Sequence, residues 1–174
     1  IVEEKPTGEI FAGVGTGTGG SSFSAGIKEK NYLGKGITLD TNFALSEDEI
    51  RGKFSVINPN FKNTDRSLNT TIESTTSDFM STSGYKTTRT GLSLGTGFEQ
   101  YQDIFINFDL SNYYEKLVTS DDATEIKKKQ EGDYFENLFL YSLTLNRLNQ
   151  SFQPTDGYFT KFSQSIPLYQ TIFF

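Results

Sequence analysis

The stretch Ile-Phe-Ile-Asn-Phe-Asp-Leu-Ser at residues 104–111 decides the fold expected for this chain of 174 residues. Every second side chain, from Ile104 to Leu110, is apolar, whereas the side chains between them include Asn107 and Ser111. Because successive side chains of an extended strand point to opposite faces, this spacing predicts a β-strand with one apolar and one polar face. No segment of the chain shows a comparable helical spacing of apolar residues.

Similar alternating runs, separated by turn residues, predict nine antiparallel strands and an all-β fold. The expected strands are Gly8–Gly15, Ser21–Lys28, Gly36–Leu45, Ile50–Ile57, Arg66–Thr76, Lys86–Phe98, Gln102–Leu117, Tyr134–Arg147 and Tyr158–Pro167. Several of these are longer than the usual strand of about 5–6 residues.

The composition excludes several classes of protein. The chain has no Cys, His or Trp, so it has no disulfides, no zinc site built from Cys or His, and no nucleophile activated by His. A net charge of −6 disfavours a nucleic-acid partner. We find no convincing catalytic pair and expect neither an enzyme nor a metal or cofactor. The longest clean apolar run, Leu138–Tyr141, is far shorter than the roughly 20 residues of a membrane helix.

The polar face of the strands favours a membrane barrel over a soluble sheet. A soluble sheet usually carries charges on its wet face, but here that face is mostly Gly, Ser, Thr and Asn. Small polar residues suit the lumen of a barrel, and their apolar partners suit lipid. Strands of about 9–11 residues span a bilayer when tilted, and closure into a barrel satisfies the edge hydrogen bonds. The sequence therefore predicts an antiparallel transmembrane β-barrel.

The connections also predict which end faces outward. If the first strand rises from the periplasm, the outward connections are Thr16–Gly20, Ser46–Glu49, Ser77–Tyr85 and Val118–Asp133. The last of these is the longest and most charged, and long outer loops are typical of such barrels. Aromatic residues at the opposite end would form an interfacial girdle: Tyr32, Phe61, Tyr101, Phe152 and Tyr158.

Two clusters suggest ligand sites but have simpler explanations. Residues 15–20 fit G-x-G-x-x-G, yet a dinucleotide site needs this motif before a helix, and a strand pattern follows instead. A hairpin turn is the better interpretation. The acidic run Glu47–Glu49 could suggest calcium, but it lacks EF-hand spacing and is expected to be a solvated hairpin tip.

Basic and aromatic residues near the outward ends have two interpretations as well. The run Lys127–Lys129 could contact anionic lipopolysaccharide, but neighbouring acids nearly cancel its charge, which favours a solvated loop. Tyr113, Tyr114 and Tyr134 are expected to be interfacial anchors rather than residues that stack on a ligand.

Four ordered motifs resemble the BamA family over nearly the whole chain. Residues 4–15 resemble the junction of the last POTRA domain with the first barrel strand, and residues 23–36 resemble the second strand and first periplasmic turn. The family's N-P-x-F and P-T-D-G turns are matched by Asn58, Pro59 and Phe61, and by Pro154, Thr155, Asp156 and Gly157. The family's sixth-loop Val-Arg-Gly-Phe motif, its last strand and its POTRA array are absent.

This resemblance implies that residues 1–6 end the POTRA junction and that residues 7–174 form about nine of sixteen barrel strands. It implies a protein of the Gram-negative outer membrane that inserts other outer-membrane proteins without enzymatic chemistry or a cofactor. The implied partners are outer-membrane lipid, client β-barrel proteins and the lipoproteins of an assembly complex, but no nucleic acid.

The resemblance also implies a lateral gate at the first strand, whose edge would template client strands. The residues expected there are Thr7, Gly8, Glu9, Ile10, Phe11, Ala12, Gly13, Val14 and Gly15. We expect Ile10, Ala12 and Val14 to face lipid. The glycines would loosen the strand, because Gly weakens strand interiors, although they could equally relieve its twist.

Two other functions remain open from the sequence. One is a small complete outer-membrane barrel that acts as a pore, adhesin or structural anchor, since Ile172 and Phe174 resemble an assembly signal. Pro167 weakens this alternative because Pro interrupts a ladder of hydrogen bonds. The other, less favoured, is a soluble β-sheet binding module.

Overall fold

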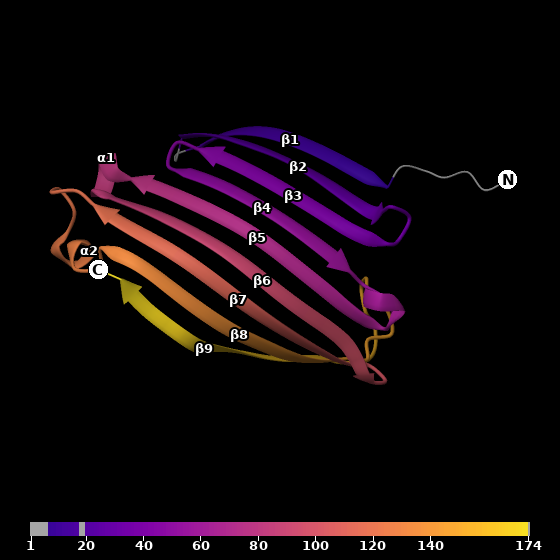
Figure 1. Cartoon of the computed structure of the whole chain (residues 1–174). Helices are drawn as coiled ribbons and strands as arrows, with labels where there is room; N and C mark the ends of the chain where they lie inside the picture. Colours follow the sequence, from indigo (N-terminus) through magenta and orange to yellow (C-terminus); the bar gives the residue numbers. More distant parts are fainter. Residues whose placement is uncertain (1–6, 18–19, 174) are drawn as a thin grey trace.

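The computed structural model describes residues 7–17 and 20–173 of the chain as one sheet of nine antiparallel strands in chain order (Figure 1). The strands are β1 (Gly8–Gly17), β2 (Gly20–Tyr32), β3 (Ile37–Ser46), β4 (Glu49–Asn58), β5 (Arg66–Phe79), β6 (Tyr85–Tyr101), β7 (Ile104–Thr119), β8 (Gly132–Asn146) and β9 (Phe159–Phe173). Each overlaps one predicted strand, so the predicted all-β fold with nine antiparallel strands is confirmed. The expected junction at residues 1–6 lies outside the described residues.

The largest error in the predicted strands is at β9. The predicted end at Pro167 is wrong, because β9 continues to Phe173. The register with β8 shifts at Pro167, between Asn137 and Leu138. An irregularity of this kind is a place where a strand tolerates a residue without a backbone N–H.

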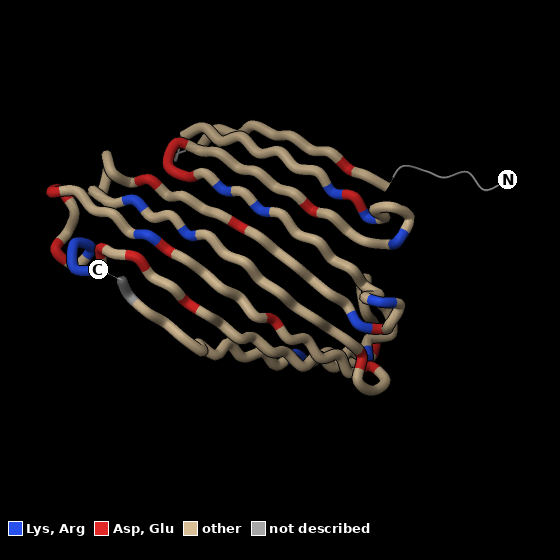
Figure 2. The backbone as a smooth tube through the Cα atoms, viewed as in Figure 1, with Lys and Arg blue, Asp and Glu red and all other residues tan. Residues whose placement is uncertain are grey.

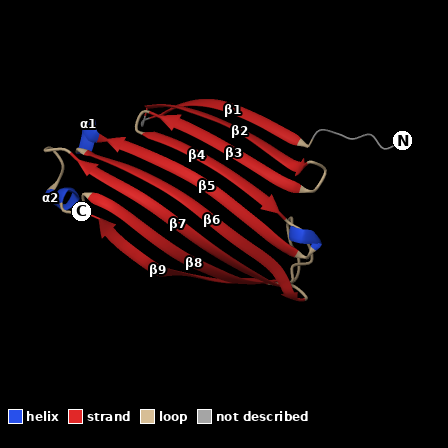
Figure 3. Cartoon of the chain, viewed as in Figure 1, coloured by secondary structure: helices blue, strands red, loops and turns tan. Residues whose placement is uncertain are grey.

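Only short helical segments interrupt the strands. They are η1 (Phe61–Asn63), α1 (Met80–Ser83) and α2 (Glu125–Lys128), and all lie in connections at the ends of the sheet (Figure 3). Within the described part of the chain, no helix is long and apolar enough to cross a membrane. The connections that contain α1 and α2 lie at one end, with the β1–β2 hairpin and the β3–β4 turn (Figure 1). These four connections are the ones predicted to share an end.

The register gives the sheet two chemically different faces. Paired residues share a face, so Ile10 lies beside Ile27, and the same row continues through Phe54 to Ile72 and Leu92. We call this side the apolar face. The opposite side, which we call the polar face, carries rows of small and hydroxyl-bearing residues, such as Ser55, Thr71, Ser93 and Ser111.

The large apolar side chains are exposed rather than packed in a core. Ile10 and Val14 are 81% and 86% exposed, and the only buried hydrophobic residues in the described ranges are Leu117 and Ala123. The accessible surface is 12425 Å², whereas a globular protein of 19.5 kDa exposes about 8,500 Å². The single layer therefore leaves its apolar face for a non-aqueous environment to cover, which argues against a soluble binding module.

Candidate functional site

Strand β1 forms one edge of the sheet. Its residues from Gly8 to Gly17 pair with β2, and no strand lies on its other side in the part of the chain that the structure describes. Strand β9 lies at the opposite edge (Figure 1), so these nine strands form an open sheet and not a small closed barrel. An edge of this kind presents a row of unpaired N–H and C=O groups to another strand.

The two faces of β1 follow the faces of the whole sheet. Ile10, Ala12 and Val14 lie on the apolar face, opposite residues of β2 that are also apolar. Glu9 and Phe11 lie on the polar face, as do the glycines at positions 13 and 15. The side of β1 expected to meet lipid is thus the side that continues the apolar face.

Side chains hold the first half of β1 to β2 more firmly than the second half. Lys30 Nζ donates to a Glu9 carboxylate oxygen at 2.6 Å, and the Thr7 hydroxyl donates to the Glu29 carboxylate. The Phe11 ring covers the Cα of Gly26, where a Cβ would collide with it.

The second half of β1 carries much less side-chain volume. On its polar face Gly13 and Gly15 oppose Ser24 and Ser22, whose hydroxyl groups are the nearest side-chain atoms. Beyond them Gly17 pairs with Gly20, which confirms a hairpin rather than a nucleotide-binding helix at the glycine-rich motif. Side chains of β1 therefore make more contacts with β2 at the start of the strand than near the hairpin.

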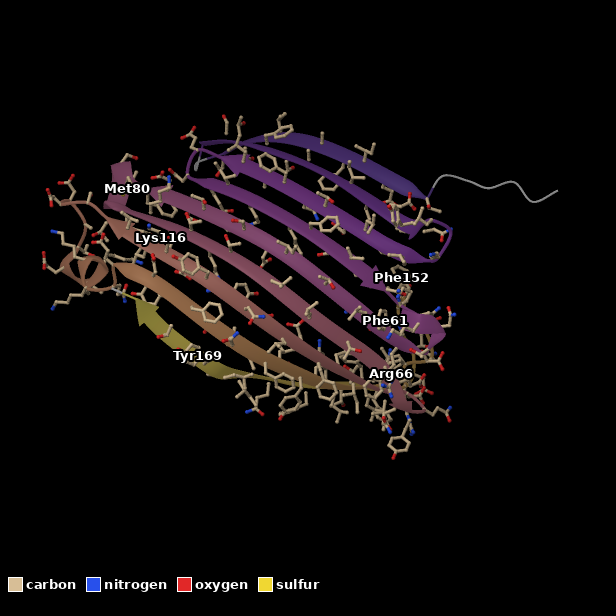
Figure 4. All side chains as sticks on the ribbon, in the orientation of Figure 1. Phe61, Arg66, Met80, Lys116, Phe152 and Tyr169 are labelled. Atoms are coloured by element: carbon tan, nitrogen blue, oxygen red, sulfur yellow. The ribbon has the colours of Figure 1, made fainter. Side chains whose placement is uncertain are left out.

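The turn that contains Asn58, Pro59 and Phe61 is built by local hydrogen bonds. The Asn58 side-chain oxygen accepts from the backbone N–H of Asn60 at 3.1 Å, an arrangement that fixes a tight turn. The Phe61 carbonyl accepts from the Thr64 hydroxyl at 2.7 Å, and the Phe61 ring lies 5.5 Å from the Lys62 ammonium group. Phe61 lies at the end of the sheet opposite α1 and α2, as does Phe152 (Figure 4).

The Pro154–Gly157 turn is ordered by one asparagine. The Asn149 side-chain oxygen accepts from the backbone N–H groups of Thr155 and Asp156 at 3.2 and 3.3 Å. Gly157 has φ +96°, and a Cβ there would collide with the Arg147 carbonyl group. Asn58 and Gly157 thus have a structural role in the two family turn motifs.

A charged cluster on the polar face was not anticipated from the sequence. The Arg89 guanidinium group lies 3.1 Å from the Glu115 carboxylate and 3.4 Å from that of Glu136, and 4.0 Å from the centre of the Tyr113 ring. Together with Tyr134 these residues line a cavity of about 490 Å³. The expectation that Tyr113 and Tyr134 are interfacial anchors is wrong, because both lie on the polar face, away from Tyr114. The two-residue alternation that starts at Ile104 already separates Tyr113 from Tyr114.

The connection between β7 and β8 folds over this cavity instead of extending into solvent. The Lys127 ammonium group lies 4.4 Å from the centre of the Tyr85 ring, and Lys127 and Lys129 both line the cavity. Ala123 is buried where this connection packs on Gly84, which has no side chain to obstruct it. Figure 2 shows the mixed charges of the connection. The interpretation of the lysine run as a solvated loop is therefore wrong for Lys127, which is half-buried, whereas Lys129 is exposed as that interpretation expects.

The acidic residues Glu47 and Glu49 contact different partners. Glu47 accepts from the backbone N–H of Ser21 at 3.4 Å, and Glu49 lies 3.0 Å from the Arg51 guanidinium group. No group of three or more acidic side chains among the described residues could hold a metal ion.

The apolar face forms a band that crosses the sheet diagonally. On β2 the band is centred on Ala25. The row of paired residues that contains Ala25 reaches β8 at Phe135, whereas the apolar run of β8 is centred on Tyr141. The band thus moves six residues along the strand over six strand steps. With about 3.4 Å per residue and about 4.8 Å between strands, the strands tilt about 35° from the normal to the band. Strands of membrane barrels tilt by about 35–45°.

An open, tilted sheet with an apolar band outside and small polar residues inside defines part of the wall of a β-barrel. Residues 31–171 match the Omp85 superfamily domain, and the chain belongs to this superfamily. It is thus part of an Omp85-family outer-membrane protein.

Among solved structures the chain resembles BamA from Haemophilus ducreyi lacking POTRA domains 1–3. The sequences are 25% identical and the TM-score is 0.71 over 95% of this chain. The match covers 35% of that shortened BamA chain, so this chain spans about a third of its length. The expected resemblance to the BamA barrel is confirmed, and the soluble binding module is overturned.

Proposed function

We propose that this protein is an outer-membrane protein assembly factor in which β1 is the edge that templates the strands of client β-barrels. The observation that carries the proposal is the position of β1, which pairs with β2 alone among the described strands. The proposed templating residues are those from Thr7 to Gly15.

The chemistry of an unpaired edge supports this role. In a strand of ten residues about half of the backbone N–H and C=O groups point away from the neighbouring strand. A client strand that adds to this edge pairs with backbone groups, so many client sequences can bind. The apolar side chains of β1 would then continue into the apolar side chains of the client, on the side that meets lipid.

The placement of the protein follows from the same proposal. We place the end of the sheet that holds α1 and α2 outside the cell, and the opposite end, where Figure 4 labels Phe61 and Phe152, in the periplasm. Exposed aromatic side chains at the periplasmic end fit an interfacial girdle. The proposed partners are the lipid of the Gram-negative outer membrane, client β-barrel proteins and lipoproteins of an assembly complex.

Cysteine crosslinking tests the proposal, because residues 1–174 contain no Cys and any Cys elsewhere in the complete protein can be replaced beforehand. Ala12→Cys in the complete protein places a thiol on β1, and Gly52→Cys is a matched control in the same row and on the same face, on β4. Strand β4 is paired on both sides, so a client cannot add there. During assembly of a stalled client with one Cys in its terminal strand, we expect Ala12→Cys to capture the client and Gly52→Cys not to do so.

Two results would contradict the templating role. In the first, Ala12→Cys captures only the final strand of its own barrel while clients are being assembled. In the second, Gly52→Cys captures clients with the same yield, which would mean that client contact does not depend on a free edge.

A further inference from the structure

The apolar face changes its chemistry toward the end that holds α1 and α2. Strands β5 to β8 have 14–17 residues, more than the roughly 9–11 that cross a bilayer. Beyond the apolar band the same face carries mainly hydroxyl, amide and charged residues, with Phe135 and Val118 among them, and we call its polar members the polar extension. Its members are Ser74, Thr76, Asp78, Lys86, Thr88, Thr90, Asn112, Tyr114, Lys116, Asp133 and Asn137.

The polar extension continues the outside of the wall and not its lumen. Thr90 and Thr88 follow Leu92 at steps of two residues on β6, so all three share one face. These two threonines therefore stand about 7 Å and 14 Å along the strand beyond the last apolar residue. In the proposed placement they lie above the hydrocarbon, at the level of the head groups of the outer leaflet.

Paired polar groups cover this surface. Hydroxyl pairs join Ser74 to Thr90 at 2.9 Å and Thr76 to Thr88 at 3.2 Å. Farther along, the Tyr114 hydroxyl donates to the Asp133 carboxylate at 2.7 Å.

The charges and the aromatic ring of the polar extension narrow the choice of partner. It holds two lysines and two aspartates, so its charge is balanced, and Lys86 pairs with Asp78 at 2.8 Å. A balanced surface does not select an anionic partner by charge. Its hydroxyl groups both donate and accept hydrogen bonds, and the Tyr114 side chain is 44% exposed. Sugar rings, which carry many hydroxyl groups and an apolar C–H face, match this chemistry.

We infer that the polar extension docks the saccharide part of lipopolysaccharide in the outer leaflet. The inference rests on the proposed placement in the membrane. The partner of the polar extension is identified by continuity. The polar extension directly adjoins the band that faces lipid chains, so the group that covers it belongs to the same lipid as those chains. With the strands tilted by about 35°, the polar extension rises about 11 Å above the band, whereas phospholipid head groups add only about 5–8 Å on each side of the hydrocarbon.

Labelling of a single Cys tests this inference in the complete protein reconstituted into vesicles. Thr88→Cys is exposed to a membrane-impermeant maleimide in vesicles of phospholipid alone and in vesicles that also contain lipopolysaccharide with its core saccharide. We expect labelling to be slower in the second vesicles by at least about fivefold, the ratio that one net hydrogen bond supports. Thr87→Cys on the polar face should label at the same rate in both, and Leu92→Cys in the band should label slowly in both.

A further variant separates a specific contact from simple shielding. In the Thr88→Cys protein, Thr90→Val removes one hydroxyl with little change in shape and should restore part of the labelling. Three results would overturn the inference: slow labelling of Thr88→Cys in both vesicles, equally fast labelling in both, or protection that Thr90→Val leaves unchanged. None of these results depends on client capture by β1, so a failure of the templating role is recognised separately.

Discussion

Replacing Gly13 by Ala should tighten β1 without distorting it. A Cβ at Gly13 would lie 3.6 Å from the Ser24 hydroxyl oxygen, which is an ordinary contact. Gly in a strand costs about 0.5–1 kcal/mol relative to Ala, because the unfolded glycine has more conformations to lose. The substitution should therefore favour the ordered strand by a factor of about two to five.

Hydrogen exchange of the β1 amides in the complete protein measures this factor. We expect exchange at residues 10–16 to slow about two- to fivefold in Gly13→Ala. Client capture through Ala12→Cys should fall in the same direction, because a more ordered β1 opens less often.

A substitution on the facing strand gives the opposite expectation. A Cβ at Gly26 on β2 would lie 2.7 Å from the Thr41 carbonyl oxygen and would collide with the Phe11 ring. Gly26→Ala should therefore displace β1 and accelerate exchange. If Gly13→Ala accelerates exchange, or if Gly26→Ala leaves it unchanged, the account of how β2 holds β1 is wrong.

Two further substitutions test the turn and the charged cluster. Gly157→Ala should destabilise the complete barrel by more than about 1 kcal/mol, because φ is positive at this residue and the Arg147 carbonyl group leaves no room for a Cβ. A lower urea midpoint would measure this loss. Gly34→Ala is the control and should cost less, because Gly34 also has a positive φ of +68° but has open space around it. Arg89→Met should lower the thermal midpoint only slightly, since its two glutamate pairs are partly exposed and worth at most about 1 kcal/mol each, and high salt should shrink the difference from the unchanged protein. A large loss of stability that persists in salt would show that packing on Tyr113, rather than charge, holds this cluster together.

The sequence predicts what depends on local alternation. The nine strands and the hairpin after Gly15 follow from two-residue spacing and turn residues, since each strand must present one apolar and one polar face. The passage of β9 through Pro167 could not be predicted, because it depends on a shift of register against β8 that the sequence does not reveal.

The cavity on the polar face could not be predicted, because it depends on distances between strands that the sequence does not contain. The cluster around Arg89 joins β6, β7 and β8, and its lid depends on Ala123 fitting against Gly84. Alternation can assign Tyr113 to the polar face, but it cannot tell that a charged connection folds back over that face.

The unequal strand lengths link the proposed gate to the proposed glycolipid surface. Strand β1 pairs with β2 over ten positions, whereas β6 and β7 pair over most of their 16–17 residues. Among the described strands only β1 and β9 are paired on one side, and β1 has the shorter ladder, ten pairs against fourteen, so β1 separates more readily from its neighbour. The extra residues of β5 to β8 lie beyond the apolar band, so they strengthen that part of the wall where no client has to enter. A barrel that lengthened β1 equally would gain a taller outer surface and lose the weakly held edge on which templating depends.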